Sequence, residues 1–414
     1  MKLRKSCIFK NTMFQTPENL SKTSVFFDIE TTGLSWRTSH LYMIGCAYYD
    51  KTEAVSRSEQ SSPAGSASAE FAETDSQKDS GWILQQWFLE KPAEEKELLE
   101  LFSAFLQEHA WDTLVHYNGT TFDIPYLQNK YRFYGIDNPL SGIKTEPDRK
   151  ADCIIPDSFL MSRDLYQEIR PYKRLLGTSS LKQRDLEVCF GLPRDDCFTG
   201  GELIDVYQNY LRSGDESLLD CLWLHNYEDV QNLLPVCAGV NAYQELFGGG
   251  FQITDVSLRA DSAIPVSDTA GGPPVLTATL MLSSPLPAPF CTESEYCALR
   301  AEKSSAVLTL PVYEGELRHY FKDYKNYYYL PDEDMAIHKS VGAFVDSAHR
   351  KKATADTCYQ RAAGAFLPQM QERFSPVFKT TRKDKISWIQ TSVIADKADD
   401  SALKEYLLDF LQAV

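Results

Sequence analysis

The chain has 414 residues, of which 43% are hydrophobic and 24% are charged, and its formal net charge is −16. This length suits two or three domains with buried cores. The acidic balance excludes a protein that coats nucleic acid non-specifically, because phosphate binding needs Lys and Arg, but it does not exclude an enzyme whose bound cations reverse the local charge.

Three further features narrow the class of protein. No stretch approaches the roughly 20 apolar residues of a membrane span, so we expect no association with a membrane. The first residues, MKLRKSCIFKNTMFQ, begin basic but contain no apolar segment of the kind found in secretory signals. The ten cysteines are scattered without a C-x-x-C pair. These features together predict reduced thiols in a cytoplasmic protein.

The first half of the chain begins with strand-like segments. Residues 24–30, 41–49 and 82–89 are rich in β-branched and aromatic residues and are expected to form strands. Residues 51–81, between the last two, are rich in Ser, Ala and Glu and nearly free of large apolar residues, so we expect a disordered insertion at the tip of a hairpin. Residues 1–22 are expected to be an N-terminal extension.

Helical patterns then alternate with short strands. Leu and Phe recur at helical spacing within residues 94–109, and Asn118-Gly119 forms a turn before a helix whose first turn contains Pro125. Short strands are expected at 113–116 and 152–155, and further helices at 157–170, 179–190, 201–212 and 216–246. This order predicts an α/β fold. A mixed five-stranded sheet, an antiparallel meander with parallel additions, would be flanked by helices.

The sequence changes character after the glycines at 248–250, which we interpret as a linker. Strands are expected at 275–283, 305–313 and 324–330, and helices at 336–348 and 354–374. Residues 251–414 are therefore predicted to form a separate, smaller α+β domain, for which the sequence indicates no role.

Asp28 and Glu30 are the first candidate site residues. They lie two apart on an expected strand, so both side chains leave the same face, while Val25, Phe27 and Ile29 occupy the other. Two like charges on a buried face cost several kcal/mol unless a counter-charge is present. A divalent cation supplies that charge. The alternative for this pair alone is a solvated strand end with salt bridges.

Two more segments contain acids with ordinary alternatives. Asp123 falls where a helix begins, where the helix dipole favours any acid. His225 and Asp229 are four apart and so share one helical face, which is also common on solvated surfaces. Each of the three acidic segments has an ordinary structural explanation when taken alone. The prediction of a site therefore depends on all three occurring in one chain.

The segments FDIETTGL, HYNGTTFDIPYL and HNYEDVQNL, in this order, resemble the three exonuclease motifs of the DEDD superfamily of 3′→5′ exonucleases, which has a ribonuclease-H-like fold. The patterns SSLKQRDLEVCFGLPR and GGELIDVYQNYLRSGD resemble its YprB-like bacterial branch. The resemblance implies an exonuclease domain over residues 23–247. It assigns the metal carboxylates to Asp28, Glu30, Asp123 and Asp229, the general base to His225, and substrate contacts to Thr31, Asn118 and Gly119.

One position departs from the superfamily pattern. Its two main classes have a histidine five residues before the last aspartate or a tyrosine four before it, whereas this chain has His225 four residues before Asp229. The offset could change the reach of the ring by part of a helical turn. Tyr227 is only two residues before Asp229 and is a poor substitute. A histidine nonetheless suits a base at neutral pH.

Four hard oxygen ligands suit two Mg²⁺ or Mn²⁺ ions rather than zinc. The resemblance implies 3′→5′ hydrolysis of single-stranded DNA or RNA from its 3′ end by a two-metal mechanism, with release of nucleoside monophosphates. Two alternatives stay open. One is a non-catalytic nucleic-acid-binding or assembly module that retains the fold, and the other is a hydrolase of short oligonucleotides or other phosphodiesters.

Weaker signals have two interpretations each. A cluster of basic residues could contact phosphates or form a mixed solvated surface: Arg163, Arg170, Lys173, Arg174, Lys182 and Arg184. Four tyrosines could stack on bases or pack within a sheet, and packing is the commoner case: Tyr324, Tyr327, Tyr328 and Tyr329.

Overall fold

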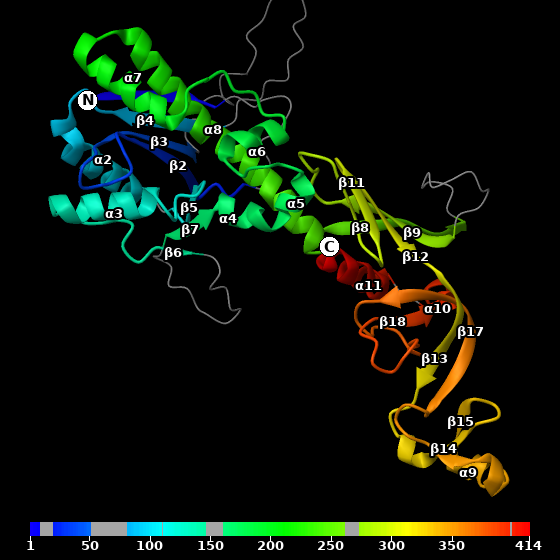
Figure 1. The fold of residues 1–414 in the computed structure, drawn as a ribbon. Coiled ribbons are helices and arrows are strands. Elements are labelled where there is room, and N and C mark those ends of the chain that lie inside the picture. The colour runs from blue at the N-terminus through cyan, green and yellow to red at the C-terminus, as the bar shows by residue number, and fades with distance from the viewer. Residues whose placement is uncertain (9–19, 51–80, 110, 146–159, 261–272, 398–399) are drawn as a thin grey trace, which may run out of the picture. The chain divides into compact units, whose positions relative to one another are not determined.

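A computed structural model describes residues 1–8, 20–50, 81–109, 111–145, 160–260, 273–397 and 400–414 (Figure 1). The chain divides into two compact units, Met1–Asn241 and Ala242–Val414. Among the helices in these described ranges, none is long and apolar enough to cross a membrane. The expected insertion at residues 51–81, apart from Gly81, and the expected strand at 152–155 lie outside the described residues.

The first unit is built around a mixed seven-stranded sheet in the order β1-β4-β3-β2-β5-β7-β6. Its strands are β1 (Lys2–Cys7), β2 (Ser24–Thr31), β3 (Leu41–Tyr49), β4 (Trp82–Phe88), β5 (Thr113–His116), β6 (Lys144–Thr145) and β7 (Met161–Asp164). The neighbours from β1 to β2 are antiparallel, and those from β2 to β6 are parallel. The α/β class and the antiparallel-then-parallel order are confirmed. The sheet has two strands more than expected, and one of them, β1, lies within the expected N-terminal extension.

Helices cover both faces of this sheet (Figure 1). They are η1 (Pro92–Glu94), α2 (Glu95–Glu108), α3 (Asp123–Tyr134), α4 (Leu165–Ile169), η3 (Arg170–Tyr172), α5 (Lys173–Leu176), α6 (Gln183–Cys189), α7 (Gly200–Ser213) and α8 (Glu216–Phe247). The predicted helix at 157–170 is wrong at Met161–Asp164, which form β7, and is confirmed at Leu165–Ile169, which form α4. β7 pairs in parallel with β5 there before the short α4 begins, so tertiary pairing outweighs the local helical pattern.

The two faces of the sheet pack against different helices, and each face has its own hydrophobic core. Val25, Phe27 and Ile29 are buried with apolar side chains of α2 and α3. The opposite face of the sheet packs against α7 and the first half of α8, where Tyr42 and Phe88 belong to the same cluster as Trp223. Asp28 and Glu30 therefore face the side covered by α8, as the alternation along the strand requires.

A glycine sets how closely α8 approaches the sheet. Gly45 of β3 pairs with Asp28 of β2. A Cβ at Gly45 would overlap Asn226 Oδ1 and lie 2.8 Å from Val230 Cγ2, both on α8. The absence of a side chain at this position lets α8 lie directly over the strand pair that contains the acids.

The second unit contains three antiparallel sheets. The five-stranded sheet has the order β10-β11-β12-β9-β8, and the three-stranded sheets have the orders β13-β17-β18 and β15-β14-β16. Their strands are β8 (Phe251–Ala260), β9 (Pro274–Leu282), β10 (Phe290–Glu293), β11 (Ala298–Glu302), β12 (Ser305–Pro311), β13 (Tyr313–Tyr320), β14 (Tyr327–Leu330), β15 (Met335–His338), β16 (Lys351–Lys352), β17 (Tyr359–Gln369) and β18 (Ser387–Gln390). The helices are η4 (Tyr324–Asn326), α9 (Lys339–Gly342), η5 (Ser347–His349), α10 (Thr391–Lys397) and α11 (Asp400–Ala413).

The α+β class of this unit is confirmed, but two predicted helices are wrong. Residues 354–374 contain the long strand β17, which pairs with β13 from Tyr313↔Phe366 to Tyr320↔Tyr359. Residues 336–348 contain the end of β15, the one-turn helix α9 and the start of η5. Alanine-rich local sequence favours a helix in the first case, and the cross-strand partner overrides it.

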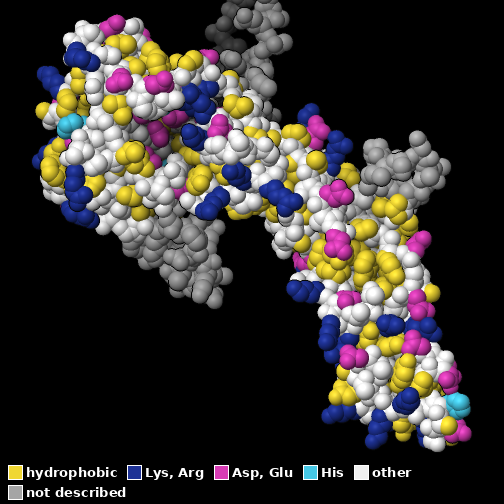
Figure 2. All heavy atoms as spheres, in the orientation of Figure 1, with side chains coloured by type: hydrophobic (Ala, Val, Ile, Leu, Met, Phe, Trp, Pro, Cys, Tyr) yellow, Lys and Arg dark blue, Asp and Glu magenta, His cyan; other side chains and the backbone are white. Residues whose placement is uncertain are grey.

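The tyrosines at 324–329, which could have stacked on bases, pack within the second unit. Tyr324, Tyr327 and Tyr329 pack against the small cluster that contains Ala336. Tyr328 lies beneath the cationic groups of Lys339 and Arg350. Within the basic cluster, Arg163 pairs with Glu168 and Arg184 pairs with Asp196, each at 2.7 Å. Figure 2 shows basic and acidic side chains on one face of the first unit, and the two interpretations of the cluster stay open.

Candidate active site

The strand β2 brings Asp28 and Glu30 to the side of the sheet under α8. Asn226 of α8 donates a hydrogen bond from Nδ2 to Asp28 Oδ2 at 3.2 Å, and Gln86 of β4 donates to Asn226 Oδ1 at 3.0 Å. Asn226 is fully buried. This chain of amides aligns α8 with the strand and leaves Glu30 without an equivalent donor.

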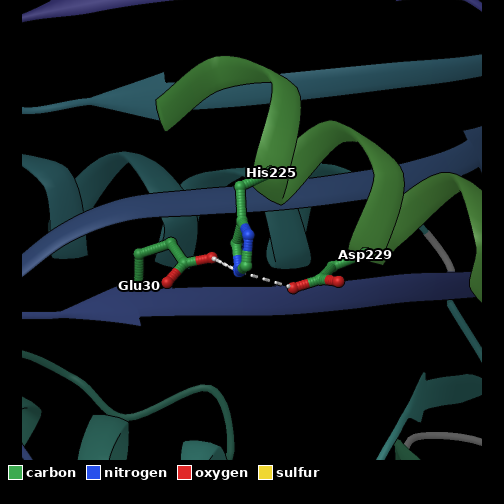
Figure 3. Close-up of side chains that lie close together, drawn as sticks. All are labelled: Glu30, His225 and Asp229. Carbon is green, nitrogen blue, oxygen red and sulfur yellow. Dashed lines mark ion pairs between the residues drawn. The ribbon is translucent and has the colours of Figure 1, made fainter. Parts of the chain in front are cut away.

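The helix α8 contributes His225 and Asp229 from one face, as their four-residue spacing predicts. The His225 Nε2 atom lies 3.2 Å from Asp229 Oδ2 and 3.7 Å from Glu30 Oε1, so the ring lies between the two carboxyl groups (Figure 3). One ligand atom from each of these three residues lies within 4.8 Å of the others. The strand and the helix thus meet at a single cluster of possible metal ligands.

Asp123 is the first residue of α3, and the turn before it is closely packed. Asn118 has a left-handed backbone with φ of 60°, and the Gly119 amide donates to His116 Nδ1 at 3.0 Å. A Cβ at Gly119 would lie 2.8 Å from the His116 ring and 2.9 Å from Asp123 Oδ2. Only glycine fits between these side chains, so the turn brings backbone directly beside Asp123.

A buried aspartate outside the predicted set holds this turn. Asp164, at the end of β7, accepts hydrogen bonds from the amides of Asn118 at 2.9 Å and Thr120 at 3.3 Å. It also lies close enough for its charge to raise the pKa of Asp123. Thr31, predicted as a substrate contact, donates its hydroxyl to the Gly33 carbonyl at 2.9 Å.

The four predicted carboxylates influence one another electrostatically. Burial, followed by the charges of Glu30, Asp229 and Asp123, raises the pKa of Asp28 well above its ordinary value. Burial raises the pKa of Glu30 to about 7 against the opposing charge of His225. Burial also raises the pKa of Asp123 to about 7. The four acids therefore lie close enough for their charges to act on one another, but only Glu30 and Asp229 belong to the 4.8 Å cluster with His225, and Asp28 and Asp229 are half-buried.

Asp229 differs from the other three acids because it has cationic partners. Its Oδ1 receives a hydrogen bond from Arg194 Nη1 at 2.5 Å, and its Oδ2 faces His225. Burial would raise the pKa of Asp229, but the hydrogen bond and charge of His225, together with Arg194, hold it below its ordinary value.

Arg194 belongs to a loop between α6 and α7 that the sequence patterns did not mark as part of the site. Its guanidinium also contacts Glu187 Oε2 and Asp196 Oδ2, each at 3.1 Å. Asp196 in turn lies 2.7 Å from His225 Nδ1. Arg194 is the last residue of the quoted pattern SSLKQRDLEVCFGLPR, and Asp196 follows two residues later. Their position in and beside this pattern is the sequence signal that could have suggested them.

His225 is held from both sides. Burial lowers its pKa, but the hydrogen bond to Asp229 and the charges of Asp229, Glu30 and Asp196 outweigh burial and raise the pKa to about 9. The carboxylates around His225 therefore favour the protonated form of its ring.

The donor set fits hard divalent cations. Four carboxylates supply oxygen ligands of the kind that Mg²⁺ and Mn²⁺ prefer. Within the described part of the chain, Glu30 Oε1 is a buried oxygen without a hydrogen-bond partner. Such an atom needs a counter-charge or a donor, and a cation between β2 and α8 would supply it.

Comparison with known proteins gives a family and a fold. A sequence model described as the RNase H superfamily matches residues 25–80 and 71–241, which together span more than half of the 414 residues. No curated protein shows significant similarity to the chain. Among solved structures, the chain is similar to the family B DNA polymerase from the hyperthermophilic archaeon Pyrobaculum calidifontis, with 15% identity and a TM-score of 0.35. That match covers 55% of this chain and 25% of the polymerase chain.

Proposed function

The chain belongs to the RNase H superfamily, and on that premise we propose that residues 23–247 are a metal-dependent 3′→5′ exonuclease domain acting on single-stranded DNA or RNA. The observation that supports this proposal is the cluster of Glu30 from β2 with His225 and Asp229 from α8, whose ligand atoms lie within 4.8 Å of one another. The charges of Asp28 and of Asp123, at the start of α3, act on the same acids. A domain that only binds or assembles has no use for mutually repelling acids, whereas phosphodiester hydrolysis needs the cations that they hold. The 3′→5′ direction, the DEDD class and the YprB-like branch rest on the sequence motifs.

We assign two divalent cations, Mg²⁺ or Mn²⁺, to Asp28, Glu30, Asp123 and Asp229. When bound, such ions lower the pKa of the attacking water and stabilise the charge that develops on the leaving 3′-oxygen. They would also offset the negative charge that raises the pKa of His225, so that the ring loses its proton and can act as a base.

The protein side chains then perform the proton transfer and the positioning. The His225 Nε2 atom accepts a proton from the attacking water, while the water oxygen bonds to phosphorus and the bond between phosphorus and the 3′-oxygen breaks. The departing strand retains a 3′-hydroxyl after proton uptake from solvent, and a nucleoside 5′-monophosphate is released. The backbone at Asn118 and Gly119 and the residue Thr31 are the proposed substrate contacts.

The competing function is a non-catalytic nucleic-acid-binding or assembly module. One observation favours it: Arg194 already gives Asp229 a cationic partner without a metal ion. On the strand side, Glu30 Oε1 has no hydrogen-bond partner among the described residues, and the charges of His225 and Arg194 do not outweigh its burial. The exonuclease is therefore the function that we propose. A cytoplasmic location stays a prediction from the sequence.

The test is incubation of the purified chain with end-labelled single-stranded DNA and RNA, with Mn²⁺, Mg²⁺ or EDTA. We expect stepwise shortening from the 3′ end that EDTA stops, and no shortening by Asp28→Ala or Asp229→Ala. Asp220→Ala is the matched control, because Asp220 is an exposed acid on the same helix as Asp229. Intact products on every substrate, or undiminished cleavage by either site variant, would contradict the proposal.

A further inference from the structure

We propose that Asp196 is a positioning residue for the reaction, which acts by fixing the His225 ring so that Nε2 faces the cation-binding carboxylates. This inference rests on the proposed nuclease function and adds a residue that the sequence motifs do not contain. The observation that supports it is the 2.7 Å contact between His225 Nδ1 and Asp196 Oδ2.

The direction of this hydrogen bond follows from the chemistry of the two groups. An ionised carboxylate only accepts, so Nδ1 must carry the hydrogen. Because burial is opposed by the Phe198 amide, His225 and Arg194, the pKa of Asp196 lies below its ordinary value. A neutral ring with its hydrogen on Nδ1 has its lone pair on Nε2, the atom that faces Glu30 and Asp229. Asp196 therefore selects the tautomer that can accept a proton from water.

Asp196 is itself held by several donors. Arg184 contacts Oδ2 at 2.7 Å and Arg194 contacts it at 3.1 Å, while the Phe198 amide donates to Oδ1 at 3.0 Å. The Asp196 side chain is almost completely buried. With both oxygens engaged and two guanidinium groups beside it, this carboxylate has a fixed orientation and a stable charge.

The loop that contains Asp196 is also fastened to the helix that contains His225. Glu228 of α8 accepts hydrogen bonds from the amides of Asp195 at 2.8 Å and Asp196 at 2.9 Å. Glu228 is three residues after His225, so both lie on the same turn of α8. This turn therefore holds the His225 ring and, through Glu228, the loop whose Asp196 contacts that ring. A movement of the loop relative to the ring would break both hydrogen bonds.

This arrangement accounts for the unusual spacing of His225. A four-residue offset places His225 on the same face as Asp229, and Nε2 then lies 3.2 Å from Asp229 Oδ2. Without a second anchor the ring could turn about its side-chain torsions toward either carboxylate. Asp196 supplies that anchor from the opposite side of the ring, so the shifted histidine keeps one orientation.

The test compares Asp196→Asn with Asp195→Asn, because Asp195 is an exposed neighbour on the same loop. We expect kcat of Asp196→Asn to fall by about 10–100-fold, the range for residues that orient a site ligand or base. A residue that only orients the base does not bind substrate or metal, so KM should change by less than about threefold. The affinity for Mn²⁺ alone, measured by titration calorimetry, should also change by less than about threefold. Asp195→Asn should retain wild-type values.

A double-mutant cycle separates positioning from a general structural role. If Asp196 acts through His225, then Asp196→Asn should cause little further loss of kcat in a His225→Gln background. Additive losses would overturn the inference. So would a wild-type kcat in Asp196→Asn.

A spectroscopic measurement on the wild-type chain needs no stable Asp196 variant. With ¹⁵N-labelled histidine and Mg²⁺ present, the His225 signal, identified by its loss in His225→Gln, should report hydrogen on Nδ1. Hydrogen on Nε2 with none on Nδ1 would overturn the inference. So would ¹⁴N coupling of His225 to bound Mn²⁺ in electron spin-echo spectra, because Nε2 would then be a metal ligand.

The two proposals fail in different ways. If the wild-type chain digests no strand with any cation, the proposed function fails and the inference falls with it. If the wild-type chain digests strands but Asp196→Asn does so equally fast, only the inference fails.

Discussion

The strand side and the helix side of the candidate site balance their charge differently. On β2, Glu30 Oε1 is buried without a hydrogen-bond partner among the described residues, and burial raises the pKa of Glu30 to about 7. On α8, Asp229 is bonded to Arg194 and His225, which hold its pKa below the ordinary value. The protein's own cations therefore outweigh burial on the helix side. On the strand side the His225 ring, 3.7 Å from Glu30 Oε1, does not outweigh burial, and a bound ion would add the missing charge.

The sharpest test of this difference is a pair of neutral isosteres. Glu30→Gln and Asp229→Asn should each lower kcat by about a thousandfold or more, since each removes a ligand from ions that supply several kcal/mol of transition-state stabilisation. Their effects on metal-free stability should differ. Glu30→Gln removes a carboxylate whose burial outweighs the opposing charge of His225, and should leave the free energy of unfolding equal or higher.

Asp229→Asn should lower the free energy of unfolding by about 3 kcal/mol, because Arg194 and His225 lose a buried partner. Urea unfolding in EDTA measures both variants against the wild-type chain. Equal stability changes in the two variants would mean that the strand and helix sides do not differ in this way.

The second prediction concerns Arg194, whose guanidinium lies within 4.0 Å of four acids, Glu187, Asp196, Glu228 and Asp229. Arg194→Met should lower the free energy of unfolding by about 3–5 kcal/mol, as expected when a buried cation leaves its partners uncompensated. Arg212→Met is the control, because Arg212 is exposed on α7. A loss below about 1 kcal/mol in urea unfolding would show that solvent, not Arg194, stabilises these acids.

The third prediction concerns the strand side and the metal ion. At a Mn²⁺ concentration of about 100 times its Kd, a single site adds about 2.7 kcal/mol to the free energy of unfolding. Thermal unfolding followed by fluorescence should therefore show a higher Tm in Mn²⁺, reversed by EDTA. The increase should be largely absent in Asp28→Asn, and a full increase in that variant would place the ion elsewhere.

The smallest expected effect comes from one partner of Arg194. Glu187→Gln keeps an acceptor oxygen, and Arg194 retains Asp196 and Asp229, so the free energy of unfolding should fall by about 1 kcal/mol or less. The value of kcat should stay within about threefold of wild type by the same reasoning. A kcat loss as large as that of Asp196→Asn would show that Glu187, too, positions His225.

The elements that could be predicted are those with a clear period of apolar residues in the sequence. Strand alternation placed Val25, Phe27 and Ile29 in the core and their acidic neighbours on the other face. The long α8 was evident from its apolar spacing and lies within one residue of its predicted end. The carboxylates were recognisable because they occur in motifs that the chain shares with a superfamily, and their roles there stay proposals.

What could not be predicted depends on contacts between distant segments. Arg194 and Asp196 lie in a short loop without periodicity, and their partners Asp229 and His225 are about 30 residues away along the chain. Strand β17 was predicted as a helix, because its alanines favour one until β13 lies beside it. The sequence near the loop does not show that it will contact α8, and the sequence near β17 does not show that it will pair with β13. Patterns along the chain therefore cannot predict these contacts.

Gly45 shows how a residue without a functional group can limit which substitutions the site tolerates. Its missing side chain admits Asn226 and Val230 of α8, the neighbours of His225 and Asp229. Any larger residue at Gly45 would push the helix away from β2 and lengthen the distance between the two sets of acids. A variant library screened for lost activity should therefore contain hits at Gly45, although no reaction step involves its atoms.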